Sequence, residues 1–123
     1  MSSEAVSRAV VADGVEWHEV CAVDDILAGT GVAALLGETQ VALFRLRDDR
    51  VYAIGNHDPF SHAPVLSRGI VGDLGGRVVV ASPLFKQHFR LEDGGCVEDE
   101  AVNVGSFPVD VVDGRVRVGV AAG

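Results

Sequence analysis

The chain has 123 residues, which fits one domain with a single core, and 48% of them are hydrophobic, which argues against a disordered chain. Its 10 basic and 18 acidic side chains give a net charge of −8, which repels phosphate backbones and excludes nucleic acid as a partner. No apolar run reaches the roughly 18 residues that a membrane-spanning helix needs, so no membrane association is expected.

The cysteines and the N-terminal residues indicate the cellular compartment. Cys21 and Cys96 are far apart and lie in no CxxC pattern, so neither a zinc site nor a disulfide framework is indicated. Residues 1–14 contain no apolar run of the length found in a signal peptide. We therefore expect a soluble protein in a reducing, cytoplasmic setting.

The first half of the chain reads as short strands separated by turns. Residues 1–14 are rich in small residues and are predicted to be a flexible arm before a domain at 15–121. Alternation of polar and apolar residues over 16–20 predicts the first strand, and Asp24 favours a single helical turn over 24–27. Three more strands are predicted, at residues 31–36, 40–47 and 51–54.

The second half continues the same pattern. Strands are predicted at 69–73 and 77–81, joined at Gly75 and Gly76, and a short one at 89–91. Valines alternate on either side of Asp113-Gly114, and an Asp-Gly pair in that position is a strong hairpin signal. Because no segment shows a helical period over ten residues, the expected class is all-β, an antiparallel sandwich or small barrel in one domain with little helix.

The polar residues that could carry chemistry lie around two proline-bearing loops, at Asp58-Pro59-Phe60 and at Ser82-Pro83-Leu84-Phe85. His57, His62 and His88 flank these loops, and a metal site with Asp58 is one possibility. However, the His-x₄-His spacing has no helix to align it, so hydrogen bonds to loop backbone are the favoured interpretation. Asp58 and Ser82 as general base and nucleophile are not favoured, since no histidine completes a triad and both residue types are ordinary turn formers beside proline.

The loop, hairpin, loop and strand order resembles the Rieske iron–sulfur domain. In that family the first loop carries Cys-x-His and the second Cys-x-x-His, and these four side chains hold a [2Fe-2S] cluster. The resemblance places Asp58 and Phe60 at the first pair of ligand positions and Ser82 and Phe85 at the second. None of these residues supplies a thiolate or an imidazole, so the resemblance implies a Rieske-like scaffold without a cluster, in which the phenylalanines fill the vacated volume.

A more specific resemblance is to the small subunit of assimilatory NAD(P)H-dependent nitrite reductase. It covers roughly residues 17–120 and depends on three runs, Asn-His-Asp-Pro-Phe-Ser at 56–61, Val-Leu-Ser-Arg-Gly-Ile-Val-Gly-Asp at 65–73 and Ala-Ser-Pro-Leu-Phe-Lys-Gln at 81–87. The resemblance implies a small subunit without catalytic residues or cofactor of its own. It also implies a large-subunit partner that carries FAD, an iron–sulfur cluster and sirohaem and reduces nitrite to ammonium.

Rigid loops without a cofactor are free to form a docking surface. The polar residues expected to meet the large subunit there are His57, His62, His88 and Lys86, the last being the only lysine in the chain. Two other interpretations stay open, a Rieske-type ferredoxin that carries electrons and a free-standing β-sandwich adaptor with another partner. The sequence leaves open the oligomeric state and the choice between NADH and NADPH.

Overall fold

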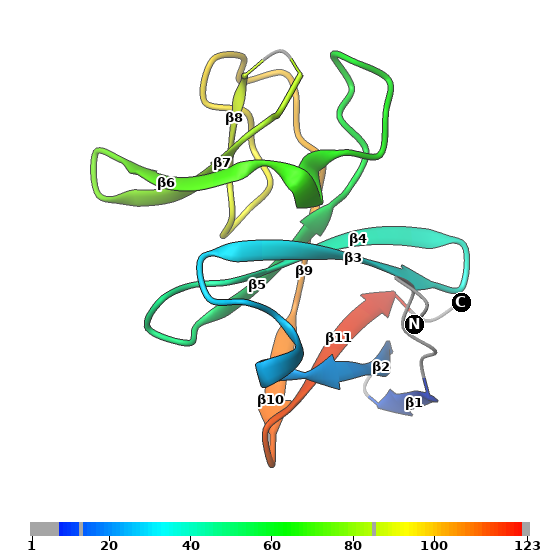
Figure 1. The fold of residues 1–123 in the computed structure, drawn as a ribbon. Helices are drawn as coiled ribbons and strands as arrows, with labels where there is room; N and C mark the ends of the chain where they lie inside the picture. The colour runs from blue at the N-terminus through cyan, green and yellow to red at the C-terminus, as the bar shows by residue number, and fades with distance from the viewer. Residues whose placement is uncertain (1–7, 13, 85, 122–123) are drawn as a thin grey trace.

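The computed structural model describes residues 8–12, 14–84 and 86–121, which form three antiparallel sheets (Figure 1). The first sheet has the order β1-β2-β11-β10, with β1 at Arg8–Ala12, β2 at Val15–Ala22, β11 at Arg115–Ala121 and β10 at Val109–Val112. The second has the order β3-β4-β5-β9, with bounds Thr30–Leu36, Thr39–Arg45, Val51–Gly55 and Ser106–Phe107. The third has the order β6-β7-β8, at Ile70–Leu74, Arg77–Ala81 and His88–Arg90.

The all-β prediction is confirmed, and the predicted strands lie within one or two residues of β2 to β8, β10 and β11. Helical structure within the described residues is limited to two 3₁₀ turns, η1 at Val23–Asp25 and η2 at Leu66–Arg68. None of the helical segments in this part of the chain has the length and apolar character of a membrane span.

The structure differs from the sequence prediction at β1 and β9. Five residues of the expected arm, Arg8–Ala12, pair with β2 as an antiparallel strand, whereas residues 1–7 and 13 lie outside the described residues. The two-residue strand β9 pairs with β5 through Ala53↔Phe107 and Ile54↔Ser106. Both are edge strands, β1 beside β2 and β9 beside β5. Each is short and is held by the strand next to it, so its own sequence carries little periodic signal.

The core has two parts, and β4 lies between them. Val41 and Leu43 point into the first cluster, between the first and second sheets, whereas Ala42 and Phe44 point into the second, between the second and third sheets. All four side chains are fully buried. A strand covered on both faces reads as a continuous apolar run instead of an alternating one, which is why Val-Ala-Leu-Phe occurs here.

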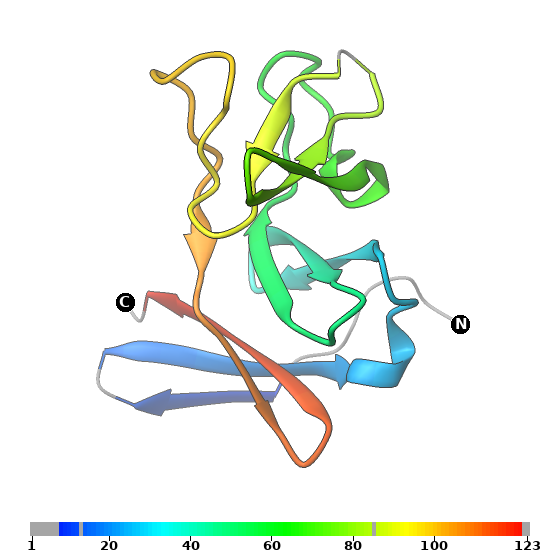
Figure 2. The ribbon, with the colours of Figure 1, turned by 90° about the vertical axis from the view of Figure 1, so that its left-hand side faces the viewer.

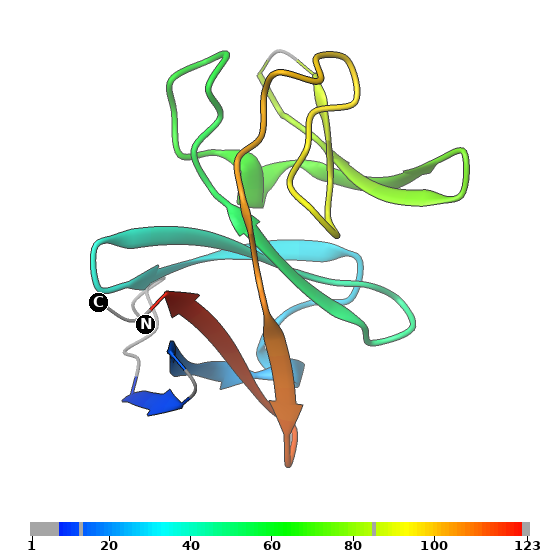
Figure 3. The ribbon, with the colours of Figure 1, turned by 180° about the vertical axis from the view of Figure 1, so that it is seen from behind.

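The second and third sheets position the two proline loops. The loop that follows β5 and the loop between β7 and β8 lie together at one end of the molecule, and the first sheet lies at the other end (Figures 1 and 3). Turning the molecule by 90° keeps both loops at that end (Figure 2). Gly69 allows η2 to approach β7 closely, because a Cβ at this position would collide with the backbone oxygen of Ala81.

Candidate functional site

The two proline loops are built alike. In the first, the Asp58 N–H donates to the Ala63 oxygen at 2.8 Å, and in the second the Ser82 N–H donates to the Gln87 oxygen at 2.9 Å. Each bond therefore closes six residues, 58–63 and 82–87, which we call the first and second proline loops. Proline stands at the second place of each and fixes its own φ, which reduces the number of conformations each loop can adopt.

The fifth residue of each proline loop has the left-handed conformation, although neither is glycine. His62 has φ 58° and Lys86 has φ 63°. Each donates its N–H to the first residue of its loop, His62 to the Asp58 oxygen at 2.8 Å and Lys86 to the Ser82 oxygen at 3.1 Å. Non-glycine residues in this region carry a backbone cost, which the two closing hydrogen bonds offset.

Asp58 and Ser82 join the two loops. The Ser82 hydroxyl donates to Oδ2 of Asp58 at 2.5 Å, and the Phe60 N–H donates to Oδ1 at 2.9 Å. Asp58 is fully buried and Ser82 is 1% exposed. The two residues that stand first in their loops thus form a buried side-chain hydrogen bond between the loops, which we call the loop clasp.

The loop clasp also sets the ionisation of Asp58. Burial raises the pKa of this carboxyl. The hydrogen bonds that the carboxylate accepts from Ser82 and from the Phe60 N–H lower the pKa by more than burial raises it, so the net pKa lies below the ordinary value. Asp58 is therefore a buried anion held by neutral donors. A carboxylate in this state is a poor general base, because its proton affinity is low.

Asn56 holds the start of the first loop and is a residue that the sequence did not single out. It is 2% exposed, and its Oδ1 accepts from the Ser67 N–H at 2.8 Å while its Nδ2 donates to the Pro64 oxygen at 3.1 Å. Its side chain thus connects β5 to the loop end and to η2. The available signal was its place at the head of the Asn-His-Asp-Pro run, where an asparagine can bond nearby backbone groups.

The four residues expected to dock a partner are brought to the same end of the molecule, but not into one cluster. The His57 and His62 rings lie 6.5 Å apart and both residues are exposed, as is Lys86 on the second proline loop. His88 lies on β8, where Glu98 accepts from its N–H at 2.8 Å and contacts its Nδ1 at 2.6 Å. No local pattern pointed to Glu98, which lies ten residues further along the chain.

Comparison with known proteins gives this geometry its context. A family model described as the Rieske-like [2Fe-2S] domain matches residues 16–119. The NADH nitrite reductase small subunit of Salmonella typhimurium is 52% identical over 104 residues, which is 84% of this chain and 96% of that protein. The solution structure of the Escherichia coli protein NirD superposes with a TM-score of 0.80 at 50% identity, covering 86% of this chain and 97% of that one.

The chain belongs to the family of the nitrite reductase small subunits. A further match shows that the same domain also occurs within a longer protein. The nitrite reductase [NAD(P)H] large subunit of Klebsiella oxytoca is 48% identical over 103 residues, which is 84% of this chain but 11% of that protein. The resemblance stated from the sequence is confirmed.

The Rieske-type cluster of the wider fold family does not fit the residues of this small subunit. Two thiolates and two imidazoles are required. Asp58 and Ser82 offer oxygen atoms that already hydrogen-bond to each other. The Phe60 ring packs against the second core cluster, with its centroid 6.3 Å from that of the Phe89 ring. Phe85, the fourth position, lies outside the described residues. Within the described ranges, no three His, Cys, Asp or Glu side chains gather closely enough to hold a metal ion.

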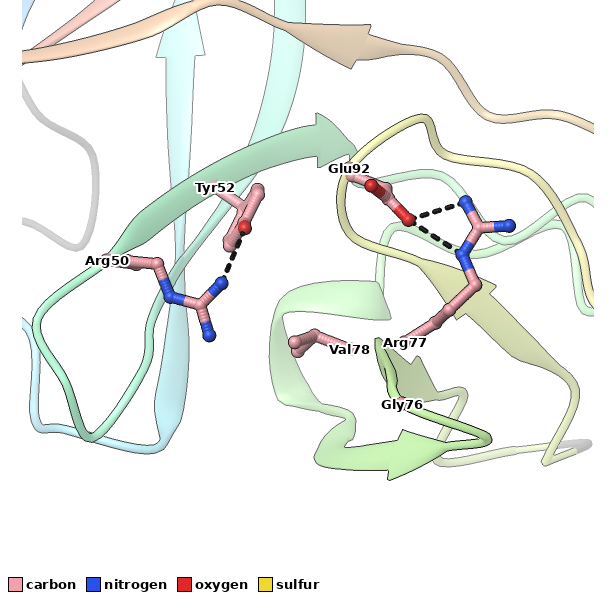
Figure 4. Close-up of a pocket in the computed structure, with 6 residues that line it drawn as sticks. All are labelled: Arg50, Tyr52, Gly76, Arg77, Val78 and Glu92. Atoms are coloured by element: carbon pink, nitrogen blue, oxygen red, sulfur yellow. Dashed lines mark hydrogen bonds and ion pairs between the residues drawn. The ribbon is translucent and has the colours of Figure 1, made fainter.

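A pocket of about 80 Å³ lies away from the loops, between the start of β5 and the β6–β7 hairpin (Figure 4). Arg50 donates to the Tyr52 hydroxyl at 3.2 Å, and Nε of Arg77 donates to Glu92 at 2.7 Å. Arg50 is also paired with Asp48 at 2.8 Å. Both guanidinium groups at this pocket therefore have carboxylate partners, Asp48 for Arg50 and Glu92 for Arg77.

Proposed function

We propose that this chain acts as the cofactor-free small subunit of a cytoplasmic NAD(P)H-dependent nitrite reductase. It supports a large subunit that carries FAD, an iron–sulfur cluster and sirohaem and reduces nitrite to ammonium. The observation that carries this proposal is the loop clasp, which places a serine–aspartate hydrogen bond where the fold family has cluster ligands, in a chain of the small-subunit family. A chain with this residue set acts through binding, and contributes no catalytic residue.

The proposed docking surface is the end of the molecule that carries the two proline loops. His57, His62 and Lys86 are exposed there. The loop clasp and the closing hydrogen bonds hold the loop backbones, so little conformational entropy is lost when a partner binds. Aromatic and cationic side chains on such a support are frequent anchors of interfaces. His88 contributes through its half-buried side chain, with Glu98 fixing its orientation.

The experiment combines the purified large subunit with the parent chain or with the double variant Lys86→Glu and His57→Ala. We expect the variant to keep the melting temperature of the parent, because both side chains are exposed. Co-purification with the large subunit should weaken, and NAD(P)H-dependent nitrite reduction by the mixture should fall. Nitrite reduction by the large subunit with an artificial dye donor should stay the same.

A matched control reverses one charge elsewhere, with Arg47→Glu on the exposed β4–β5 turn. This variant should bind and support turnover like the parent. If the double variant also behaves like the parent, docking does not use these loop residues. If the parent neither binds the large subunit nor changes its NAD(P)H-dependent activity, the proposed function itself is wrong.

The two alternatives give different results in simple measurements. A Rieske-type electron carrier requires a cluster, so purified protein would show visible absorbance and a Rieske-type paramagnetic resonance signal after reduction. The residue set at Asp58, Phe60 and Ser82 speaks against this alternative. A free-standing adaptor would co-purify with another protein and leave nitrite reduction unchanged.

A further inference from the structure

The third sheet has one face in the second core cluster, and its other face carries both buried and exposed residues, with Val79 2% exposed and Ile70 77% exposed. Val71, Val80 and Phe89 lie on the core face. Strand pairing places the residues next to them in the chain on the opposite face.

On that opposite face, Ile70 pairs with Ala81 and Ala81 pairs with His88. The Val97 N–H donates to the His88 oxygen at 2.8 Å, so Val97 extends the same line of residues. We call Ile70, Ala81, His88 and Val97 the outer row.

The two ends of the outer row, Ile70 and Val97, are apolar and exposed, whereas Ala81 and His88 between them are half-buried. Ile70 is 77% exposed and Val97 41% exposed, and Leu74, on the same face of β6, is 42% exposed. Between Ile70 and Leu74 stands Gly72, where a Cβ would meet no atom within 4 Å. Ile70 and Leu74, exposed on one face of the same strand, offer apolar surface that a partner protein can cover.

The position of β6 makes this face accessible. β6 is an edge strand with β7 as its one neighbour in the sheet order. The β6–β7 hairpin projects from the side of the molecule (Figures 1 and 3). A partner can therefore reach Ile70 and Leu74 without displacing another element.

The border of the outer row beside Val97 is acidic, whereas Arg77 and Arg90 lie on the same face beside Leu74 and Val79. Val97 is followed by Glu98, Asp99 and Glu100, all exposed, on a turn in which the Ala101 N–H donates to Oδ1 of Asp99 at 3.0 Å. Within the described part of the chain, no arginine or lysine forms an ion pair with these three carboxylates. A surface complementary to this side of the outer row is apolar, with basic residues opposite the turn that follows Val97.

We propose that the outer row is a docking face for the nitrite reductase large subunit, which meets it with an apolar surface bordered by lysine or arginine. This inference rests on the proposed function. A second copy of this chain is the less suitable occupant, because each copy has a net charge of −8 and two outer rows would bring two acidic turns together. His88 joins this face to the proline loops, so the two surfaces are continuous.

The test measures the Kd of the holo large subunit for the parent, Ile70→Thr and Leu27→Thr. Leu27 is the matched control, since it is 74% exposed and lies outside the third sheet. Both variants should keep the melting temperature of the parent. We expect Ile70→Thr to weaken binding about tenfold, the loss typical of an interface anchor, and Leu27→Thr to bind within about twofold of the parent.

A second pair of variants tests the acidic border. Asp99→Asn with Glu100→Gln keeps the side-chain shapes and removes two charges, as does the control Glu38→Gln with Asp113→Asn on turns of the other two sheets. At low salt the first pair should bind about threefold to tenfold more weakly than the control pair. At high salt the two pairs should bind alike, because screening removes the charge term.

Three results decide the outcome. Weaker binding by Ile70→Thr and a salt-dependent loss in the Asp99 and Glu100 variant support the inference. If the parent binds and both variants bind like their controls, the outer row is not the docking face, whereas the proposed function stands. If the parent does not bind the large subunit, the proposed function is wrong and this inference falls with it.

Discussion

Asp58 is a fully buried carboxylate whose partners are a hydroxyl and a backbone N–H instead of a cation. A buried anion is costly unless hydrogen bonds replace its lost hydration. Ser82 supplies one of these bonds, and Phe60 supplies another from within the same loop. Each bond therefore contributes to stability mainly by preventing the cost of an unsatisfied buried charge.

Ser82→Ala should consequently lower the free energy of unfolding by about 1–3 kcal/mol, because it leaves Asp58 buried without its strongest donor. Urea unfolding of the parent and the variant measures the difference. Ser106→Ala is the control, since Ser106 is exposed, and it should change the same quantity by less than about 0.5 kcal/mol. Equal effects of the two substitutions would show that the loop clasp does not stabilise the fold.

Asp58→Asn should change how stability depends on pH. The pKa of Asp58 is lowered in the folded state from the ordinary value of 3.8, so its ionised form stabilises the fold above that value. This contribution is lost as pH falls through the lowered folded pKa. Asparagine has no such titration.

The difference in unfolding free energy between the parent and Asp58→Asn should therefore shrink on acidification from about pH 6 to pH 3. Asp48, Asp93 and Glu98, whose pKa values are also lowered, remain in both proteins and cancel in this difference. A difference that stays constant or grows over this range contradicts the assignment of a lowered pKa to Asp58.

Among the elements, the β6–β7 hairpin shows most directly how sequence sets local structure. Gly75 has φ 61° and Gly76 has φ 86°, and Leu74 pairs with Arg77 on either side of them. Two successive residues with positive φ form the turn that matches the twist of a hairpin. This turn places β6 beside β7 and thereby sets which of its residues face outward.

Gly75 offers a clean test because a Cβ there would meet no atom within 4 Å. Gly75→Asn should leave the melting temperature nearly unchanged, since asparagine adopts the left-handed region readily. Gly75→Val should lower the free energy of unfolding by about 1–2 kcal/mol, because a β-branched residue is strained in the left-handed region. If both variants have the same stability, the turn has another conformation in solution.

At the scale of the whole molecule, three sheets and two core clusters support the two proline loops. Phe60 packs on the second core, and Asp58 and Ser82 bond across the gap between the loops. The fold family uses metal–ligand bonds at this position, whereas here packing and one hydrogen bond connect the same loops.

The protein should therefore stay colourless after incubation with iron and sulfide under reducing conditions, and should hold no stoichiometric iron. The physical reason is that Asp58, Phe60 and Ser82 supply no thiolate or imidazole. Visible absorbance, iron analysis and paramagnetic resonance after dithionite measure this. A Rieske-type resonance signal would show that other residues provide the ligands.

The sequence by itself determined the all-β class, nearly all strands and the family. Alternating residues and turn pairs such as Gly75-Gly76 are local signals, and the peptide runs around Asp58 and Ser82 are specific to the family. The same runs also indicated which ligand positions lack cysteine and histidine. These features could be predicted because they depend on neighbours in the chain.

Only the tertiary structure decided what those residues do. The bond between Asp58 and Ser82 joins positions 24 residues apart, and Glu98 reaches His88 from ten residues away. The exposure of Ile70 likewise depends on β6 being an edge strand. Contacts between distant segments leave no periodic pattern in either segment, because they are set by how sheets pack and not by local backbone preference.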